Sequence, residues 1–162
     1  MAIIVRGKTK CPLCGQLIKD GEEAVGFPNF VGNELDPLWV FTDGAFHAEC
    51  FHTHPLSEKA LERCDEAIKR NGPRNRVCVV CEKQITDPDE YFTLGHLTAD
   101  EAAPLYRYNY VQAHSSCLPK WRQLTYVTKL IQNLKDSGTW QGNALGILLA
   151  ELREAMHREA IA

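Results

Sequence analysis

The spacing of cysteine and histidine residues constrains this 162-residue chain more than any other feature. The pattern C-x2-C-x32-H-x2-C occurs twice, and the second copy follows the first at an offset of 67 positions. Its members are Cys11, Cys14, His47 and Cys50 in the first copy and Cys78, Cys81, His114 and Cys117 in the second. Other residues match in the same register without a gap, among them Ile18 with Ile85, Glu23 with Glu90, and Pro37-Leu38-Trp39 with Pro104-Leu105-Tyr106. A gapless match of this length indicates a duplicated structural unit.

This spacing predicts one zinc ion in each repeat. A C-x2-C turn places two thiolates on one side of a tight knuckle, and an H-x2-C pair presents two more ligands from the first turn of a helix. Four ligands of the Cys3His type close a tetrahedral site, as in structural zinc centres, whereas catalytic zinc keeps an open position. We therefore expect the eight residues above to hold two zinc ions. An iron–sulfur centre fits less well, because each set contains a histidine without a Rieske-like order.

The repeat also separates these eight residues from the other cysteine and histidines. Cys64 aligns with Ile131, which predicts a buried thiol in an apolar core. His52, His54 and His96 align with residues of other types, so we do not expect them to bind metal. His157 falls in the last predicted helix, where we expect it to be solvated.

Composition places the chain among ordinary globular proteins, with 44% hydrophobic and 24% charged residues. The longest apolar run, residues 145–150, is far shorter than the roughly 20 residues that cross a membrane, so no membrane partner is expected. The first ten residues lack the organisation of a signal peptide, which predicts a cytoplasmic protein. In that compartment seven cysteines are better explained by metal binding than by disulfides.

The sequence divides into four predicted segments. They are a basic N-terminal arm at 1–10, a first zinc unit at 11–72, a second zinc unit at 73–138 and a C-terminal helix at 139–162. The first zinc unit carries 5 basic and 11 acidic side chains, a formal charge of −6, and the second carries 8 basic and 7 acidic, a charge of +1. Because phosphate contacts need a concentrated basic face, this distribution of charge argues against nucleic-acid binding and favours a basic partner for the first unit.

We expect an α+β fold of tandem knuckle, β-hairpin and helix units with a C-terminal helical extension. Strands are predicted on either side of a turn within 18–27, at 91–94, and at 38–42 and 105–110 leading to the two histidines. A helix should begin near Ser57, bury a stripe of Leu61, Cys64 and Ile68, and stop at Gly72-Pro73. A longer helix with its apolar stripe from Trp121 to Leu134 is predicted to end at Ser137-Gly138, and a last helix is predicted at about 140–160. The last one should pack against its predecessor, with a partner-binding helix as the alternative.

The knuckle and H-x2-C segments at 11–18 and 46–51 resemble treble-clef zinc units. They look like the first zinc half of a LIM domain and the tandem C-x2-C…H-x2-C fingers of poly(ADP-ribose) polymerases. The resemblance implies that the same eight residues are zinc ligands. A LIM domain continues into a second cysteine pair, where this chain has Thr53 and Lys120, and the polymerase fingers present basic and apolar residues to DNA ends. Protein scaffolding and DNA-break binding are therefore functional analogies.

These features predict a non-enzymatic protein-interaction module, in which zinc supplies folding energy and leaves the surface free for recognition. The 32-residue segments carry six aromatic residues that could anchor an interface, although we expect Trp39, Phe41, Tyr106 and Tyr108 to help fill the small cores. The six candidate anchors are Phe27, Phe30, Trp39, Tyr106, Tyr108 and Tyr110. One concrete version is an inhibitor or immunity-type protein that covers a basic partner such as a nuclease.

Two other classes of function remain open from the sequence. A nucleic-acid-binding tandem zinc finger would use Arg6, Lys8 and Lys10 of the arm, Arg74 and Arg76 of the linker, and Arg107, which lies among tyrosines that could stack on bases. An enzyme would use His52 and His54 beside Glu49, but the chain has no phosphate-binding loop and no nucleophile elbow. We therefore expect no catalytic residues and no cofactor besides zinc.

Overall fold

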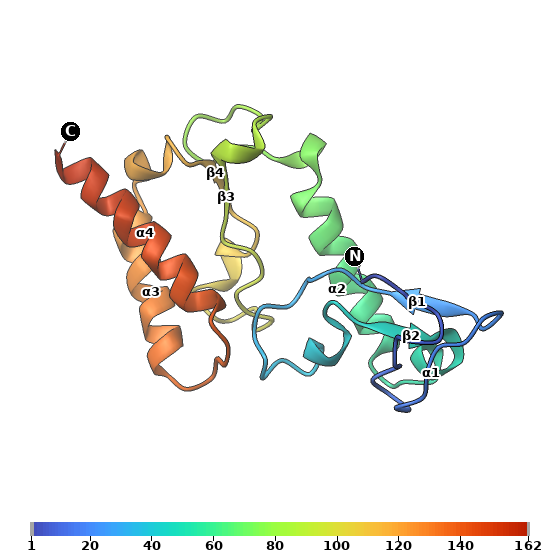
Figure 1. The fold of residues 1–162 in the computed structure, drawn as a ribbon. Coiled ribbons are helices and arrows are strands. Elements are labelled where there is room, and N and C mark those ends of the chain that lie inside the picture. The colour runs from blue at the N-terminus through green and yellow to red at the C-terminus, as the bar shows by residue number, and fades with distance from the viewer. Residues whose placement is uncertain (1, 162) are drawn as a thin grey trace. The chain divides into compact units, whose positions relative to one another are not determined.

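A computed structural model describes residues 2–161 and combines helices with two small antiparallel sheets, an α+β arrangement (Figure 1). The chain forms two compact units. Unit 1 contains the residues up to Val31 together with Asp36–Glu66, and unit 2 contains Gly32–Leu35 together with the chain from Ala67 onward.

Unit 1 is built around one two-stranded sheet. Strand β1 (Ala24–Gly26) pairs with β2 (Ala45–His47), and the short helix α1 (Ala48–His52) follows β2 directly. Helix α2 (Ser57–Asn71) begins in this unit. Phenylalanine rings fill the core, with the Phe27 ring centroid 5.0 Å from that of Phe51 and 6.1 Å from that of Phe41. The chain leaves β2 at His47, so the sheet places the first histidine next to this core.

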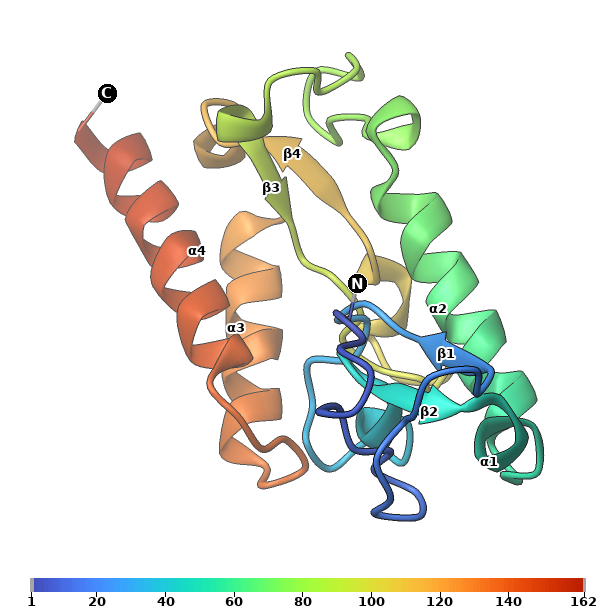
Figure 2. The same ribbon diagram turned by 45° about the vertical axis from the view of Figure 1, so that its right-hand side comes forward.

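Unit 2 repeats the sheet and adds two long helices. Strand β3 (Tyr91–Thr93) pairs with β4 (Gln112–His114), and α3 (Leu124–Asp136) and α4 (Ala144–Ile161) lie side by side (Figure 2). Each helix buries one stripe of residues at helical spacing. The stripes are Leu124, Val127, Thr128 and Ile131 on α3 and Leu145, Leu149, Leu152 and Ala155 on α4. The prediction that the last helix packs against the one before it is confirmed, because both stripes belong to one core cluster.

The elements of the two repeats occur at equivalent positions. Strands β1 and β2 recur as β3 and β4 at the 67-residue offset, and so do the two isolated bridges that close the knuckles, Lys10 with Leu17 and Val77 with Gln84. The left-handed backbone at Gly15 recurs at Glu82, and that at Asp43 recurs at Tyr110. The gapless sequence match therefore corresponds to a repeated backbone path.

Two predicted strands are wrong. Residues 38–42 and 105–110 form 3-10 turns at Trp39–Phe41 and Tyr106–Tyr108, and the strands that lead to the histidines begin later. The first turn forms because Asp36 accepts backbone N–H bonds from Leu38 through its side chain and from Trp39 through its carbonyl, both at 2.8 Å. Asx-Pro turn chemistry outweighs the strand preference of aromatic residues here. Within 18–27 only Ala24–Gly26 is a strand, whereas the strand predicted at 91–94 is confirmed by β3.

Some predicted core residues are also exposed. The buried face of α2 consists of Ala60, Cys64 and Ala67, whereas Leu61 and Ile68 are 40% and 57% exposed. The prediction of Cys64 as a buried thiol is confirmed, but the phase of the stripe is wrong. The buried positions lie one residue before the predicted ones, at Ala60 and Ala67, because the size of an apolar side chain does not by itself decide which face of a helix is packed. Trp39 and Tyr106 are 36% and 40% exposed instead of filling the cores.

Across residues 2–161, no helix combines the length and the apolar character that a membrane span requires.

Candidate metal centres

Each cluster begins with a knuckle held by backbone hydrogen bonds. In unit 1 the Cys11 N–H donates to Gln16 O, and the Gly15 N–H donates to Cys11 O at 2.8 Å. The residue after the second cysteine takes a left-handed φ of 73° at Gly15 and 60° at Glu82. Glycine adopts this conformation without strain, whereas glutamate does not. The turn brings the two thiols of each C-x2-C pair to the same side of the chain.

The second ligand pair comes from the end of the hairpin. His47 is the last residue of β2 and Cys50 lies in α1, while His114 is the last residue of β4 and Cys117 lies in a hydrogen-bonded turn. The strand sets the direction of each histidine, and the turn that follows carries the cysteine back beside it. The helix predicted at the H-x2-C segment is confirmed in unit 1, where α1 carries Cys50, whereas unit 2 has a turn there.

The structure brings all eight predicted residues together in two groups of four. Within each group the candidate ligand atoms lie within 4.8 Å of one another. The Nδ1 atom of His47 is 3.4 Å from the Cys14 Sγ and 3.9 Å from the Cys50 Sγ, and His114 has the same two distances to Cys81 and Cys117. Tetrahedral zinc with bonds of about 2.0–2.3 Å places its ligand atoms roughly 3.5–3.8 Å apart. Both groups could hold a metal ion of this size.

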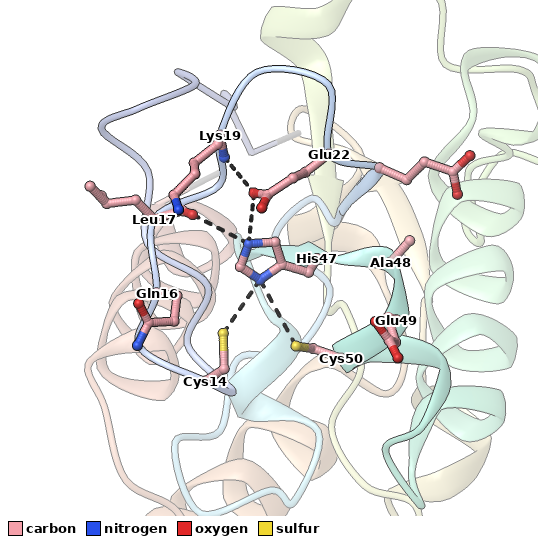
Figure 3. Close-up of a pocket in the computed structure, with 10 residues that line it drawn as sticks. Cys14, Gln16, Leu17, Lys19, Glu22, His47, Ala48, Glu49 and Cys50 are labelled. Carbon is pink, nitrogen blue, oxygen red and sulfur yellow. Dashed lines mark hydrogen bonds and ion pairs between the residues drawn. The ribbon is translucent and has the colours of Figure 1, made fainter.

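The outer face of His47 is also bound. Its Nε2 lies 3.3 Å from the Leu17 carbonyl oxygen and 3.2 Å from the Glu22 carboxylate, on the side of the ring opposite Cys14 (Figure 3). Because Nδ1 faces the sulfur atoms, the proton of the neutral ring belongs on Nε2, where it donates to these oxygens. A carboxylate or carbonyl behind a histidine orients the ring and raises its basicity as a metal ligand.

The first cysteine of each cluster is buried, but its surroundings favour the thiolate form. Burial raises the pKa of Cys11, and backbone hydrogen bonds from His47, Cys14 and Leu13 offset this and bring the pKa to about 7. The same balance brings the pKa of Cys78 to about 6. At Cys78 the Val80 and His114 N–H groups each donate to Sγ at 3.4 Å. Thiolates, and not thiols, are the form that binds metal.

The other shifted groups hold protons that a metal ion would displace. A hydrogen bond that the His47 ring donates to the Cys11 thiolate is the main cause that raises the pKa of His47 to about 9. Burial and the neighbouring thiolates raise the pKa of Cys50 and of Cys117 to about 11. Without a counter-ion the three neighbouring sulfur atoms keep protons, so they carry less negative charge than they would around a divalent cation. This sensitivity to a nearby positive charge is the electrostatic signature of a cation site.

The turn of the second cluster is supported by a different carboxylate. The Glu90 side chain accepts hydrogen bonds from the Ser116 N–H at 3.0 Å and from its hydroxyl at 2.6 Å, between the two ligands His114 and Cys117. The hydrogen bonds from Ser116 lower the pKa of Glu90. Neither Glu22 nor Glu90 was predicted from the sequence as a support residue. Glu90 aligns with Glu23 and not with Glu22, so the repeat carried no signal for either role.

The remaining cysteine and histidines lie outside the two groups. Cys64 is buried on α2, and burial raises the pKa of its thiol. His54 packs its ring against Phe41 at 5.1 Å and accepts the Leu56 N–H. Within residues 2–161 the metal-ligand groups contain none of His52, His54, His96 and His157.

A pocket of about 510 Å³ opens beside the first cluster (Figure 3). Its lining includes three residues of the cluster, Cys14, His47 and Cys50, and three carboxylates, Glu22, Glu23 and Glu49. The site thus joins a thiolate group to an acidic surface.

Comparisons of the chain with protein-family models, with characterised proteins and with solved structures find no match. The class of the protein therefore rests on its own geometry: an α+β chain with two Cys3His groups that could bind metal.

Proposed function

We propose that the protein is a non-enzymatic zinc-binding module with two structural Cys3His sites. The observation that carries this proposal is the pair of four-residue groups with the same sulfur-to-nitrogen distances at equivalent positions of a duplicated fold. Three thiolates and one imidazole suit zinc, and four protein ligands leave no position for a reacting water. Zinc would connect the knuckle to the end of the hairpin in each unit.

The arrangement resembles a treble clef, in which a knuckle, a hairpin and a following helix or turn supply the ligands. That resemblance extends to the first zinc half of LIM domains and to the tandem fingers of poly(ADP-ribose) polymerases. It supports a structural role for both ions. It also supports a recognition function. The strands are only three residues long, so zinc would supply the folding energy that they cannot and leave the surface free for recognition.

A protein partner is favoured by one pair of exposed aromatic residues. Trp39 and Tyr106 occupy the same position in the two repeats, at the start of the 3-10 turns, and both are more than one-third exposed. The other four candidate anchors are buried: Phe27, Phe30, Tyr108 and Tyr110. Large aromatic side chains that reach the surface are frequent anchors of interfaces.

The charge of the first zinc segment favours a basic partner, which is consistent with an inhibitor or immunity-type binder. Nucleic-acid binding is the weaker alternative, because the basic segments are partly engaged within the chain. The Arg6 guanidinium donates to the carbonyls of Lys19 and Glu22, and Arg76 stacks on the Tyr91 ring at 4.0 Å. We propose no catalytic residue.

Metal analysis of the purified chain tests the zinc proposal. We expect two zinc ions per chain, one ion in Cys14→Ser and in Cys81→Ser, and two in the control Cys64→Ala. The variants of the clusters should also lose the native melting transition of their own unit. A wild-type chain with one ion or none would contradict the proposal, as would a Cys64 variant that loses metal.

The interaction proposal is tested by affinity purification followed by mass spectrometry. We expect a partner that binds the wild type and is lost with Trp39→Ser or Tyr106→Ser. Tyr126→Ser is the matched control, because Tyr126 is 48% exposed on α3 but lies outside the 3-10 turns. Equal capture by all three variants would place the interface elsewhere, and a gel shift with nucleic acid at low salt would favour the alternative.

A further inference from the structure

We propose that the two metal centres differ in exchange: the first exchanges its ion with external cations through the carboxylate-lined pocket, and the second retains its ion. This inference rests on the proposed zinc function. It assigns to the first centre a property that structural zinc sites do not need, namely access for a second cation.

The cysteines of the two centres differ in exposure. Cys11 and Cys78, the first cysteines, are both fully buried. Cys14 is exposed, whereas its counterpart Cys81 is half-buried. An incoming cation can therefore contact the Cys14 sulfur in the first centre while the remaining ligands still hold the resident ion.

The pocket provides the route to this sulfur. Its volume of about 510 Å³ far exceeds that of a hydrated cation, and Cys14, Cys50 and His47 form part of its wall. Figure 3 shows the sulfur atoms of Cys14 and Cys50 directed to the same nitrogen of His47, with Glu22 on the far side of the ring. The ligand atoms on the pocket side are the ones that would leave the first ion and take the second.

The charges of the pocket favour cations. Glu22, Glu23 and Glu49 line it with only one basic residue, Lys19. In the second repeat the position of Glu49 is taken by Ser116, which binds the carboxylate of Glu90. The first centre therefore has the carboxylates of Glu23 and Glu49 in its pocket, beside a Glu22 that contacts His47, where the second has the hydrogen-bonded pair of Glu90 and Ser116. Acidic residues around a recess raise the local concentration of cations and their rate of association.

The exchange step conserves charge and protons. An incoming divalent cation such as Cd²⁺ would first bond to the Cys14 thiolate, and each ligand that leaves Zn²⁺ would then bond to the new ion, until Cys11, Cys14, His47 and Cys50 all hold it and Zn²⁺ leaves as the hydrated ion. One divalent cation replaces another, so no proton or electron is transferred.

The test is the rate of Cd²⁺ exchange into the zinc-loaded protein, followed by cadmium–thiolate absorbance and by native mass spectrometry. We expect one ion to exchange rapidly and the other slowly. In Glu23→Gln/Glu49→Gln, which leaves the Glu22 contact to His47 intact, the rapid phase should slow by about 3- to 10-fold at low salt, and the difference should disappear near 1 M salt. The matched control is Glu58→Gln/Glu62→Gln, which removes the same charge from the exposed face of α2. Its rapid phase should stay within twofold of the wild type.

The outcomes separate this inference from the proposed function. A chain that binds no zinc overturns the proposed function and with it the exchange. Two bound ions that exchange at equal rates overturn only the exchange proposal. A rapid phase that the pocket variant leaves unchanged also overturns it, because the ion would then leave by another route.

Discussion

The packing of α4 decides whether the C-terminal helix is part of the core of unit 2 or a free partner-binding element. Leu149 lies on α4 with 1% of its side chain exposed and belongs to the core cluster that includes α3. Replacing it with alanine removes buried carbon and leaves a cavity, which in well-packed cores costs about 3 kcal/mol or more. For a unit of this size each kcal/mol lowers the Tm by roughly 4 °C or more, so the expected shift is about 12 °C or more.

The matched control lies two residues away on the same helix. Ile147 is 57% exposed, so Ile147→Ala should change the free energy of unfolding by no more than about 0.5 kcal/mol. Both variants are compared with the wild type by thermal unfolding, followed by circular dichroism at saturating zinc, and both should keep two ions. If Leu149→Ala melts within a few degrees of Ile147→Ala, then α4 is not packed as described, and a free recognition helix becomes the better explanation.

Two further predictions concern the knuckles and the protons of the clusters. Gly15→Ala should destabilise unit 1 by about 1 kcal/mol in denaturant unfolding, because the φ of 73° at Gly15 disfavours any side chain, although no atom lies within 4 Å of the new carbon. The control Gly146→Ala lies inside α4 and should instead stabilise unit 2 by up to about 1 kcal/mol. A loss of stability at both positions would contradict this reasoning. Acidification should release metal, because groups with a pKa above the ambient pH take up a proton when the ion leaves, and each weakens binding by about tenfold per pH unit. The pKa of Cys11 in the first centre is about 7, whereas that of Cys78 in the second is about 6, and Cys50 and Cys117 share a raised pKa of about 11, so the first centre takes up its protons at the higher pH. Metal content after dialysis at decreasing pH should therefore show loss from the first centre at the higher pH, and the reverse order would refute the assignment.

The sequence determined the features that depend on local spacing. Four features follow from patterns within a short stretch of chain or from the repeat. They are the duplication, the grouping of eight residues into two sets of four, the end of α2 before Gly72-Pro73, and the two C-terminal helices. Cys64 was also separated from the clusters because its repeat partner is an isoleucine. These features are robust because ligand spacing and helix periodicity act over a few residues.

Tertiary structure decided which side chains reach the surface and how the two centres differ. Turn chemistry at Asp36-Pro37 converted an apparent strand into a 3-10 turn and left Trp39 36% exposed. Two contacts join residues that are distant in sequence and break the repeat register: Glu22 with His47, and Glu90 with Ser116. The exposure of Cys14 likewise has no equivalent at its repeat partner. Burial and hydrogen bonding depend on what the rest of the chain packs against each residue, so identical ligand spacing produced two centres with different surroundings.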